Sequence, residues 1–364
     1  MREIYFWRAE GSWVCEIPRL DDREMEAAEE TARHTKNTWQ KNRGFREILK
    51  NTVQGKTAEA VFEACLEQIA GVSLSVYDQF RTDGMKNHAP VDALIFQKET
   101  AEAVRRDCES RLAEAAAGSG SGVIPVKLRE YLSSHGAVTV EIKSSVLKGR
   151  DLAGVSHSCR RTKEDFSVIA ANILERDFFV YPHFLRSSEE IGSFYQYAEY
   201  VRALRGDEFP AGNRAFLHRL MREEYDNACD VYTRLYFDYE GGHVYVPGYV
   251  SREDFFAWPE IGKMPGQKSG GAVYYMRSIR DRHPVEEIGR DPRLWNRDRQ
   301  AAWERLFCGH EMVCPVCGGV LQVCGSRKHE QYYLRCFDCR RNFSMDREYG
   351  LRKTDEKGNR RNGR

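Results

Sequence analysis

The spacing of four cysteines constrains the fold of this chain more than any other feature. Two C-x2-C pairs, eighteen residues apart, supply Cys314, Cys317, Cys336 and Cys339. Two such knuckles bring four thiolates to one tetrahedral zinc ion, which leaves no open coordination position for catalysis. Between them, the β-type runs VLQVCG and QYYLRC indicate a hairpin. We therefore predict a structural Zn²⁺ ribbon within residues 301–346.

The other cysteines indicate the compartment. The chain has eleven cysteines, of which six crowd between Cys308 and Cys339 and five are scattered singly. Scattered thiols with one cluster fit a reducing environment and a metal site better than a disulfide framework. No run of about 18 apolar residues occurs, so no membrane span is expected. These features together predict a cytoplasmic protein.

Basic and aromatic residues interleave in and after the predicted ribbon. The basic ones that we select as nucleic-acid-binding candidates are Arg327, Lys328, Arg335, Arg340 and Arg341. Basic side chains can contact phosphates while aromatic rings stack on bases. Residues 340–364 hold nine Lys/Arg and four Asp/Glu, a net charge of +5, although the whole chain carries only +1. The alternative interpretation is a solubilising, disordered tail over residues 347–364.

Upstream of the ribbon, helical and strand periodicities alternate. Helices are expected over 22–42, 56–70, 98–116, 163–175 and most of 185–226, and strands over 72–80, 91–96, 137–142, 177–184 and much of 230–276. Gly71 is expected to end the second helix, and GSGSG at 118–122 is expected to be mobile. The aromatic residues of 230–276 are expected to be sheet core. This order predicts an α/β or α+β fold, a mixed sheet flanked by helices.

One strand carries residues suited to phosphodiester hydrolysis. In VTVEIKSS, Glu141 and Lys143 project to the same face, whereas Ile142 points into the opposite one and offers its carbonyl as a metal ligand. Asp92 opens the neighbouring strand and can supply a second carboxylate. Carboxylates that hold a divalent cation make water nucleophilic, and a lysine beside them can orient or deprotonate that water.

The order of GKTAEAVFEACL, YDQFRTDGMKNHAPVDALIF and VTVEIKSS resembles the PD-(D/E)XK nuclease superfamily over residues 55–184. The resemblance implies that Glu59, Asp92, Glu141 and Lys143 are catalytic. Asp92, Glu141 and the Ile142 carbonyl would bind Mg²⁺ or Mn²⁺. Glu63, one helical turn after Glu59, is a rival for the auxiliary acidic position. Two departures from the family pattern are the extra residue in Pro90-Val91-Asp92 and the long gap between Asp92 and Glu141.

These features predict four segments: an N-terminal extension (1–50), a restriction-endonuclease-like domain with added strands (51–300), the zinc ribbon (301–346) and the basic tail (347–364). The ribbon is similar to those attached to topoisomerases and other DNA enzymes. The implied activity is Mg²⁺-dependent hydrolysis of DNA by an endonuclease of defence, restriction or repair, with a homodimer able to cut both strands. The alternatives are an RNA nuclease and a non-catalytic nucleic-acid-binding protein.

Overall fold

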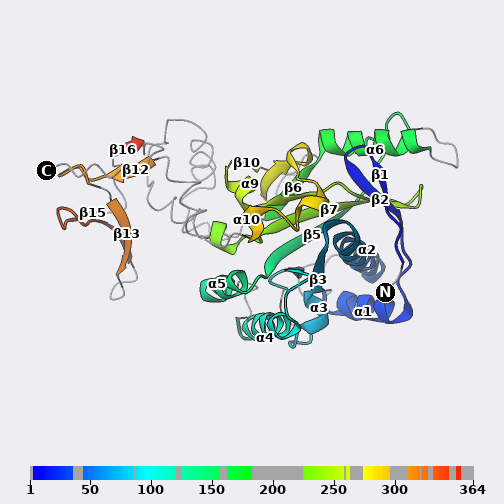
Figure 1. Ribbon diagram of the computed structural model, residues 1–364, viewed down its shortest axis with the longest axis horizontal. Helices are drawn as coiled ribbons and strands as arrows, with labels where there is room; N and C mark the ends of the chain where they lie inside the picture. Colours follow the sequence, from blue (N-terminus) through cyan, green and yellow to red (C-terminus); the bar gives the residue numbers. More distant parts are fainter. Residues whose placement is uncertain are drawn as a thin grey trace. The chain divides into compact units, whose positions relative to one another are not determined.

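The computed structural model describes most of the chain in two compact units (Figure 1). The described residues are 3–35, 44–85, 87, 89–119, 124–155, 162–182, 224–257, 260–262, 274–295, 310–319, 321–326, 331–343 and 350–353. The first unit comprises Met1–Tyr181, Cys229–Arg252 and Arg277–Arg297. The second comprises Pro182–Ala228, Glu253–Met276 and Asp298–Arg364. Most of the expected 185–226 helical segment lies outside the described residues.

A mixed sheet forms the centre of the first unit, as expected for the predicted fold class. Its strands run in the order β1-β2-β8-β7-β5-β4-β3, and β9 pairs with β7. Their bounds are β1 Trp7–Ala9, β2 Ser12–Glu16, β3 Val72–Val76, β4 Ala93–Gln97, β5 Val138–Val146, β7 Val231–Asp238, β8 His243–Val246 and β9 Tyr249–Ser251. Strands β5 and β7 are parallel, and the other neighbouring strands are antiparallel. Two strands of the sheet therefore come from the first 50 residues.

Helices surround this sheet. They are α1 Asp22–Thr35, α2 Phe45–Cys65, α3 Tyr77–Phe80, α4 Glu102–Ser119, α5 Val126–Ser134, α6 Lys163–Arg176 and α10 Pro292–Trp295. Helix α2 continues into a π-helical turn, Leu66–Ala70, and Gly71 ends it with a left-handed φ of 70°. That conformation strains any residue with a Cβ, which explains the glycine there. Among the described helices, none has both the length and the apolar character needed to cross a membrane.

Successive residues of the central strands face opposite sides of the sheet, and both sides are buried along all of β7 and most of β4. On one side, Ile95, Val140 and Ile142 pack in a cluster with Val61 and Phe62 of α2. Because successive strand residues face opposite ways, Glu141 and Lys143 point to the other side. The sheet thus fixes which residues can take part in a polar site.

The second unit contains the predicted ribbon hairpin. Strands β13 (Leu321–Ser326), β14 (Gln331–Cys336) and β15 (Asn342–Phe343) form an antiparallel sheet, and β12 (His310–Val313) pairs with β16 (Gly350–Lys353). Strands β10 (Glu260–Gly262) and β11 (Tyr274–Ser278) also pair antiparallel. Short elements complete the described structure: β6 Phe178–Pro182, α9 Arg252–Ala257 and two 3-10 turns, Ile279–Asp281 and Val285–Glu287.

Several boundaries differ from the sequence-based expectations. The helix expected over 56–70 already begins at Phe45. The strand expected over 72–80 stops at Val76, because Tyr77 turns into α3, where its carbonyl accepts a hydrogen bond from Arg81 N–H. Helix α4 runs on through Gly118 and Ser119 of the segment that was expected to be mobile, and residues 120–122 lie outside the described ranges. A short helix, α9, interrupts the expected strands of 230–276.

The aromatic residues expected to be sheet core are confirmed in that role. Tyr232, Tyr236, Tyr245, Tyr249 and Tyr275 rank among the largest fully buried side chains. Tyr239 differs, with 45% of its surface exposed. The buried rings fill the sheet faces and leave no exposed stacking platform at those five positions.

Candidate active site and metal centre

Strand register brings Asp92 and Glu141 opposite each other. Ala93 pairs with Val140 in the antiparallel β4–β5 ladder, so the preceding residue, Asp92, faces Glu141. The Asp92 backbone N–H donates to the Val140 carbonyl over 3.1 Å. Its Oδ2 accepts a 2.6 Å hydrogen bond from the Ile142 N–H. Asp92 and Glu141, which are far apart in sequence, therefore lie opposite each other on neighbouring strands.

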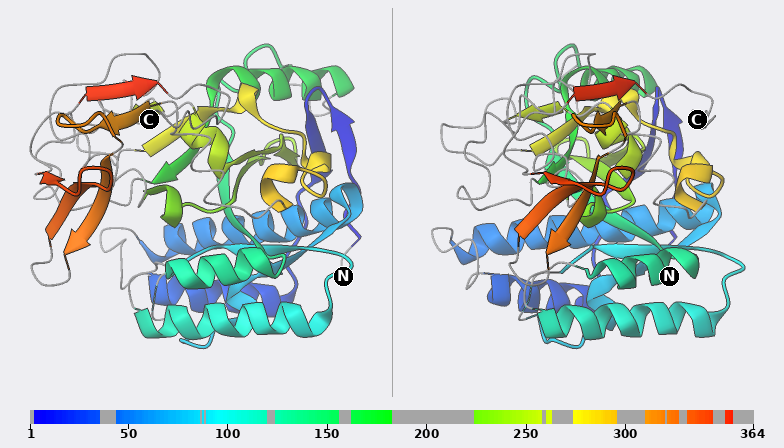
Figure 2. Two further views of the ribbon diagram at one scale, coloured as in Figure 1. Left: turned by 60° about the vertical axis from the view of Figure 1, so that its left-hand side comes forward. Right: turned by 90° about the vertical axis from the view of Figure 1, so that its left-hand side faces the viewer.

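The long insertion between them folds as a separate helical layer. Helices α4 and α5 lie side by side (Figure 2). From α4, Glu109 accepts a 2.5 Å hydrogen bond from Ser75 Oγ of β3, and the Arg105 guanidinium lies 5.8 Å from the Phe96 ring centroid of β4. The insertion packs onto the outer strands and leaves β4 free to pair with β5.

Lys143 lies beside Glu141 on the same face of β5. Its Nζ donates a hydrogen bond to Glu141 Oε1, and 41% of its side chain is exposed, against 19% for Glu141. Burial lowers the pKa of Lys143, but the charges of Glu141 and Asp92 outweigh burial and hold it above the ordinary lysine value. Lys143 is therefore a fixed positive charge, better suited to orienting a water or offsetting phosphate charge than to deprotonating the water.

The carboxyl group of Asp92 is strongly perturbed. Burial and the negative charges of Glu141 and Glu59 raise its pKa to about 8, against the opposing effects of Lys143 and the Ile142 N–H. A carboxyl group crowded by other carboxylates favours either a proton or a cation. The negative charges around Asp92 therefore favour a proton or a cation at this position.

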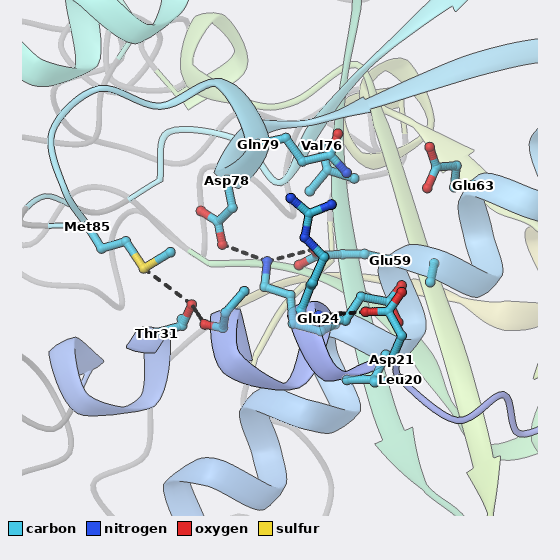
Figure 3. Close-up of a pocket in the computed structure, with 14 residues that line it drawn as sticks. Leu20, Asp21, Glu24, Thr31, Glu59, Glu63, Val76, Asp78, Gln79 and Met85 are labelled. Atoms are coloured by element: carbon cyan, nitrogen blue, oxygen red, sulfur yellow. Dashed lines mark hydrogen bonds and ion pairs between the residues drawn. The ribbon is translucent and has the colours of Figure 1, made fainter. Parts of the chain in front are cut away.

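Glu59 lies on α2 and is already bound by a lysine. Lys56 Nζ lies 2.7 Å from Glu59 Oε2 and 2.6 Å from Asp78 Oδ2. Burial raises the pKa of Glu59, while Lys56 lowers it. Glu59 and Glu63 both line a cavity of about 490 Å³ (Figure 3). Its walls come from α1, α2, β3 and the connection that follows β3. Glu59 therefore faces this cavity, and its charge acts on Asp92.

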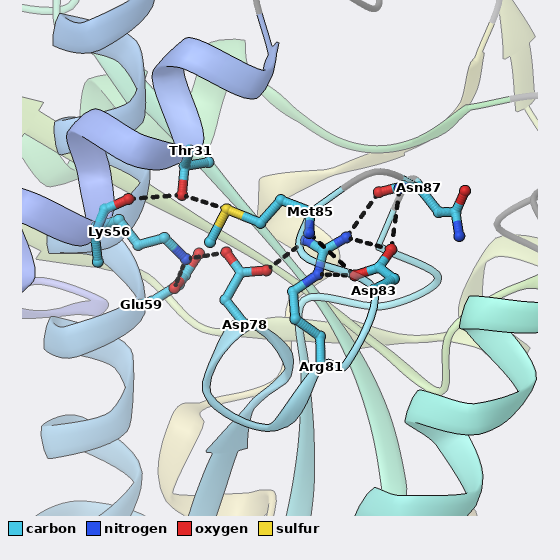
Figure 4. Close-up of polar contacts among 9 residues, drawn as sticks. Thr31, Lys56, Glu59, Asp78, Arg81, Asp83, Met85 and Asn87 are labelled. Atoms are coloured by element: carbon cyan, nitrogen blue, oxygen red, sulfur yellow. Dashed lines mark hydrogen bonds and ion pairs between the residues drawn. The ribbon is translucent and has the colours of Figure 1, made fainter.

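A chain of charges ties α2 to the connection that leads to Asp92 (Figure 4). Asp78 accepts from Arg81 Nη1 over 2.8 Å, and Asp83 accepts from Arg81 Nε over 2.8 Å. Asp83 also accepts from the Asn87 N–H over 3.0 Å. Lys56 is not among the residues predicted from sequence, although its i,i+3 spacing from Glu59 was a usable signal. Asp78 joins only through the tertiary fold.

A buried thiol near Glu141 is not a nucleophile. Cys229 is 5% exposed, and burial together with the charge of Glu141 raises its pKa far above the usual thiol value. Reactivity belongs to the thiolate, so a thiol kept neutral is inert. Cys229 therefore adds no reactive thiolate beside the carboxylates and Lys143.

The four predicted zinc cysteines converge in the second unit. Their sulfur atoms all lie within 4.8 Å of one another, with Cys317 and Cys336 3.4 Å apart and Cys314 and Cys339 3.6 Å apart. Burial raises the pKa of the Cys314 thiol, but hydrogen bonds from the Val316 and Cys317 N–H groups and from the Cys339 and Cys317 thiols outweigh burial and hold that pKa below the usual thiol value. This donor set suits a structural metal such as zinc. Within the described ranges, no other group of three or more His, Cys, Asp or Glu side chains is close enough to hold a metal.

The predicted nucleic-acid-binding residues divide into two groups. Arg335, Arg340 and Arg341 belong to the described ribbon, where Arg340 and Arg341 are exposed. Arg327 and Lys328 lie outside the described residues.

Comparisons of the chain with protein-family models, with curated proteins and with solved structures found no match in any of the three.

Proposed function

We propose that the first unit is a Mg²⁺- or Mn²⁺-dependent nuclease that hydrolyses DNA phosphodiester bonds. The observation that carries this proposal is the position of Asp92 opposite Glu141, with Lys143 hydrogen-bonded to Glu141 on the same face. Carboxylate and carbonyl oxygens are the ligands that hard divalent cations prefer. The raised pKa of Asp92 supports a site that accepts positive charge.

Each residue of the candidate site would have a separate role. Asp92, Glu141 and the Ile142 carbonyl would hold the metal, which when bound supplies Lewis acidity and a nucleophilic water. Lys143 orients that water and offsets phosphate charge as the transition state forms. Glu59, held by Lys56, supplies a further negative charge near Asp92.

Element order and the second unit support DNA as the substrate. Helix α2 with Glu59, the β3–β4 hairpin and β5 with Glu141 follow one another as the resemblance to PD-(D/E)XK nucleases implies. The four-cysteine ribbon adds basic and aromatic side chains suited to nucleic acid. By the likeness to restriction-type enzymes, the role is an endonuclease of defence, restriction or repair that acts as a homodimer.

Substitution of Lys143 tests the proposal. In an assay with DNA and Mg²⁺ or Mn²⁺, we expect Lys143→Ala to lower the cleavage rate at least about 100-fold, the usual effect of removing a transition-state charge partner. Lys143→Arg keeps the charge and retains part of the rate. The matched control is Lys148→Ala, which removes an exposed lysine two residues after the end of β5.

The same assay separates the alternatives. Cleavage of RNA but not DNA, lost in Lys143→Ala, assigns an RNA nuclease to the same residues. Binding of nucleic acid without cleavage of either polymer, with both metals supplied, overturns the hydrolase proposal. That result favours a binding protein that uses the exposed Arg340, Arg341 and Phe337.

A further inference from the structure

The two knuckles of the ribbon share one backbone geometry but carry different side chains. The first reads C-P-V-C-G-G from Cys314, and the second reads C-F-D-C-R-R from Cys336. In each, the N–H of the first cysteine donates to the carbonyl five residues later, over 2.7 Å to Gly319 and 2.9 Å to Arg341. Arg340 and Arg341 therefore stand where the first knuckle has two glycines.

Arg340 occupies a backbone conformation that favours glycine. Its φ is 59°, and the equivalent Gly318 has a φ of 73°. A left-handed conformation is unfavourable for any residue with a Cβ. The Arg340 side chain is exposed, so burial of this side chain does not offset the strain of the left-handed backbone conformation. Strained residues of this kind persist mainly where a side chain is needed for function.

An exposed aromatic ring lies on the same knuckle. Phe337 is 55% exposed, and the Arg335 guanidinium lies 5.4 Å from its ring centroid. On the first knuckle, Val316 is 50% exposed. Phe337 adjoins Cys336 and Val316 adjoins Cys317, whose sulfur atoms are 3.4 Å apart, so both apolar side chains belong to the metal end of the ribbon. Cation–π contact with Arg335 holds the ring while leaving it accessible.

We propose that the second knuckle, formed by Phe337, Arg340 and Arg341 with Arg335 against the ring, is a binding site for single-stranded DNA. One unpaired base stacks on Phe337, and Arg340 and Arg341 contact the adjacent phosphates. The partner is single-stranded because duplex bases are already stacked and paired, whereas an exposed ring needs a free base face. The inference deepens the proposed function and rests on it only for the choice of DNA as the polymer.

The test measures binding without cleavage. The full-length protein is titrated with a fluorescent oligothymidylate of about 15 nucleotides, the length that a small binding module covers. The buffer contains no Mg²⁺ or Mn²⁺, so the binding measurement does not depend on cleavage, and no chelator, so that zinc stays bound. We expect Phe337→Ala to weaken binding roughly 5- to 100-fold, the range for loss of one stacked base, and Phe337→Trp to retain it.

Arg340→Gly separates function from folding. It removes the strain, so we expect a melting temperature at or above that of the wild type and an unchanged zinc content. Binding should nevertheless weaken, and the slope of log K against log salt should fall by about 0.7, the value for one phosphate contact on a single strand. Arg106→Ala, which removes an exposed cation of α4 paired with Glu102, is the control and should leave binding unchanged.

The outcomes are separable from those of the nuclease assay. Wild-type binding by both Phe337→Ala and Arg340→Gly overturns the knuckle site, whether or not the protein cleaves DNA. Tighter binding of a duplex of the same length that does not depend on Phe337 also overturns it. If both variants lose binding while the wild type cleaves nothing, the knuckle site stands and the nuclease proposal fails.

Discussion

At the scale of single residues, Asp92 shows a conflict between folding and the proposed chemistry. Its carboxyl group lies opposite Glu141 in a buried position, which raises its pKa to about 8. An unfolded chain ionises the same group near pH 4. Between about pH 4 and pH 8, the folded, metal-free protein therefore holds a proton on Asp92 that the unfolded chain releases.

The conflict predicts that Asp92→Asn stabilises the metal-free protein. Asparagine keeps an oxygen for the Ile142 N–H but has no charge to bury. Because the folded pKa is raised, the wild type loses stability as pH rises from about 4, and the loss is complete above about 8. Thermal unfolding at a series of pH values should show little difference near pH 4 and the largest gain for Asp92→Asn above pH 8. A gain that is equal at all pH values would contradict this cause.

The orientation of Glu141, Ile142 and Lys143 was predictable from the local pattern of the strand. The alternation in VTVEIKSS predicted that Glu141 and Lys143 share a face and that Ile142 packs in the core, and both hold. The pattern did not reveal the charge state of Lys143. That property depends on how closely Glu141 and Asp92 approach in the folded sheet.

At the scale of elements, the connection between β3 and β4 is held by ion pairs more than by regular structure. Lys56 on α2 bonds both Glu59 and Asp78, and Asp78 in turn accepts from Arg81. These side chains are between 8% and 19% exposed, so solvent screens them only in part. The network holds in place the connection between β3 and β4, which leads to Asp92.

Lys56→Met should therefore destabilise the fold. It leaves Glu59 and Asp78 without their shared cation, at an expected cost of about 2 kcal/mol, between the small value of exposed pairs and the larger one of fully buried pairs. Urea denaturation measures the change in the free energy of unfolding. Arg46→Met, at an exposed position of the same helix, is the control and should change it by less than about 0.5 kcal/mol. Equal effects of the two variants would refute the role given to Lys56.

Element existence was predictable from sequence, whereas several boundaries and partners were not. The hairpin, the β5 strand and helix α6 follow from periodicity. The strand expected over 72–80 ends at Val76 because Tyr77 buries its ring and the chain turns toward Lys56. The insertion between Asp92 and Glu141 was predicted correctly as helical in part, but its packing on β3 and β4 needed tertiary information.

At the scale of the whole molecule, the two units differ in how they are stabilised. The first unit buries a large apolar cluster around the sheet. Among the described residues of the ribbon, the buried core consists of Cys314, Leu321, Leu334 and Cys336, with Cys339 and Phe343 packed against it. Two leucines contribute roughly 2–3 kcal/mol each, far less than the roughly 10–16 kcal/mol that structural zinc supplies to small domains. We therefore expect the stability of the ribbon to depend on a metal held by its four cysteines.

Loss of the metal should unfold the ribbon alone. We expect Cys336→Ser, or a strong chelator, to lower the zinc content below one per chain and to expose residues 310–343 to protease. The thermal transition of the first unit should stay in place, since its core contains none of the four ligands. Metal analysis and limited proteolysis check both points. A ribbon that remains resistant to protease without zinc would contradict the dependence.

The parallel pairing of β5 with β7 governs the order in which the chain assembles. Val140 pairs with Val231 and Val146 with Phe237. About ninety further residues must therefore be synthesised after β5 before its second neighbouring strand, β7, is complete. Closing so long a loop is slow compared with forming the local β3–β4 hairpin. During synthesis, the strand that carries Glu141 and Lys143 is an open sheet edge, a template for wrong pairing. Because β7 covers this edge, we expect mutations in β7 to lower the folding yield.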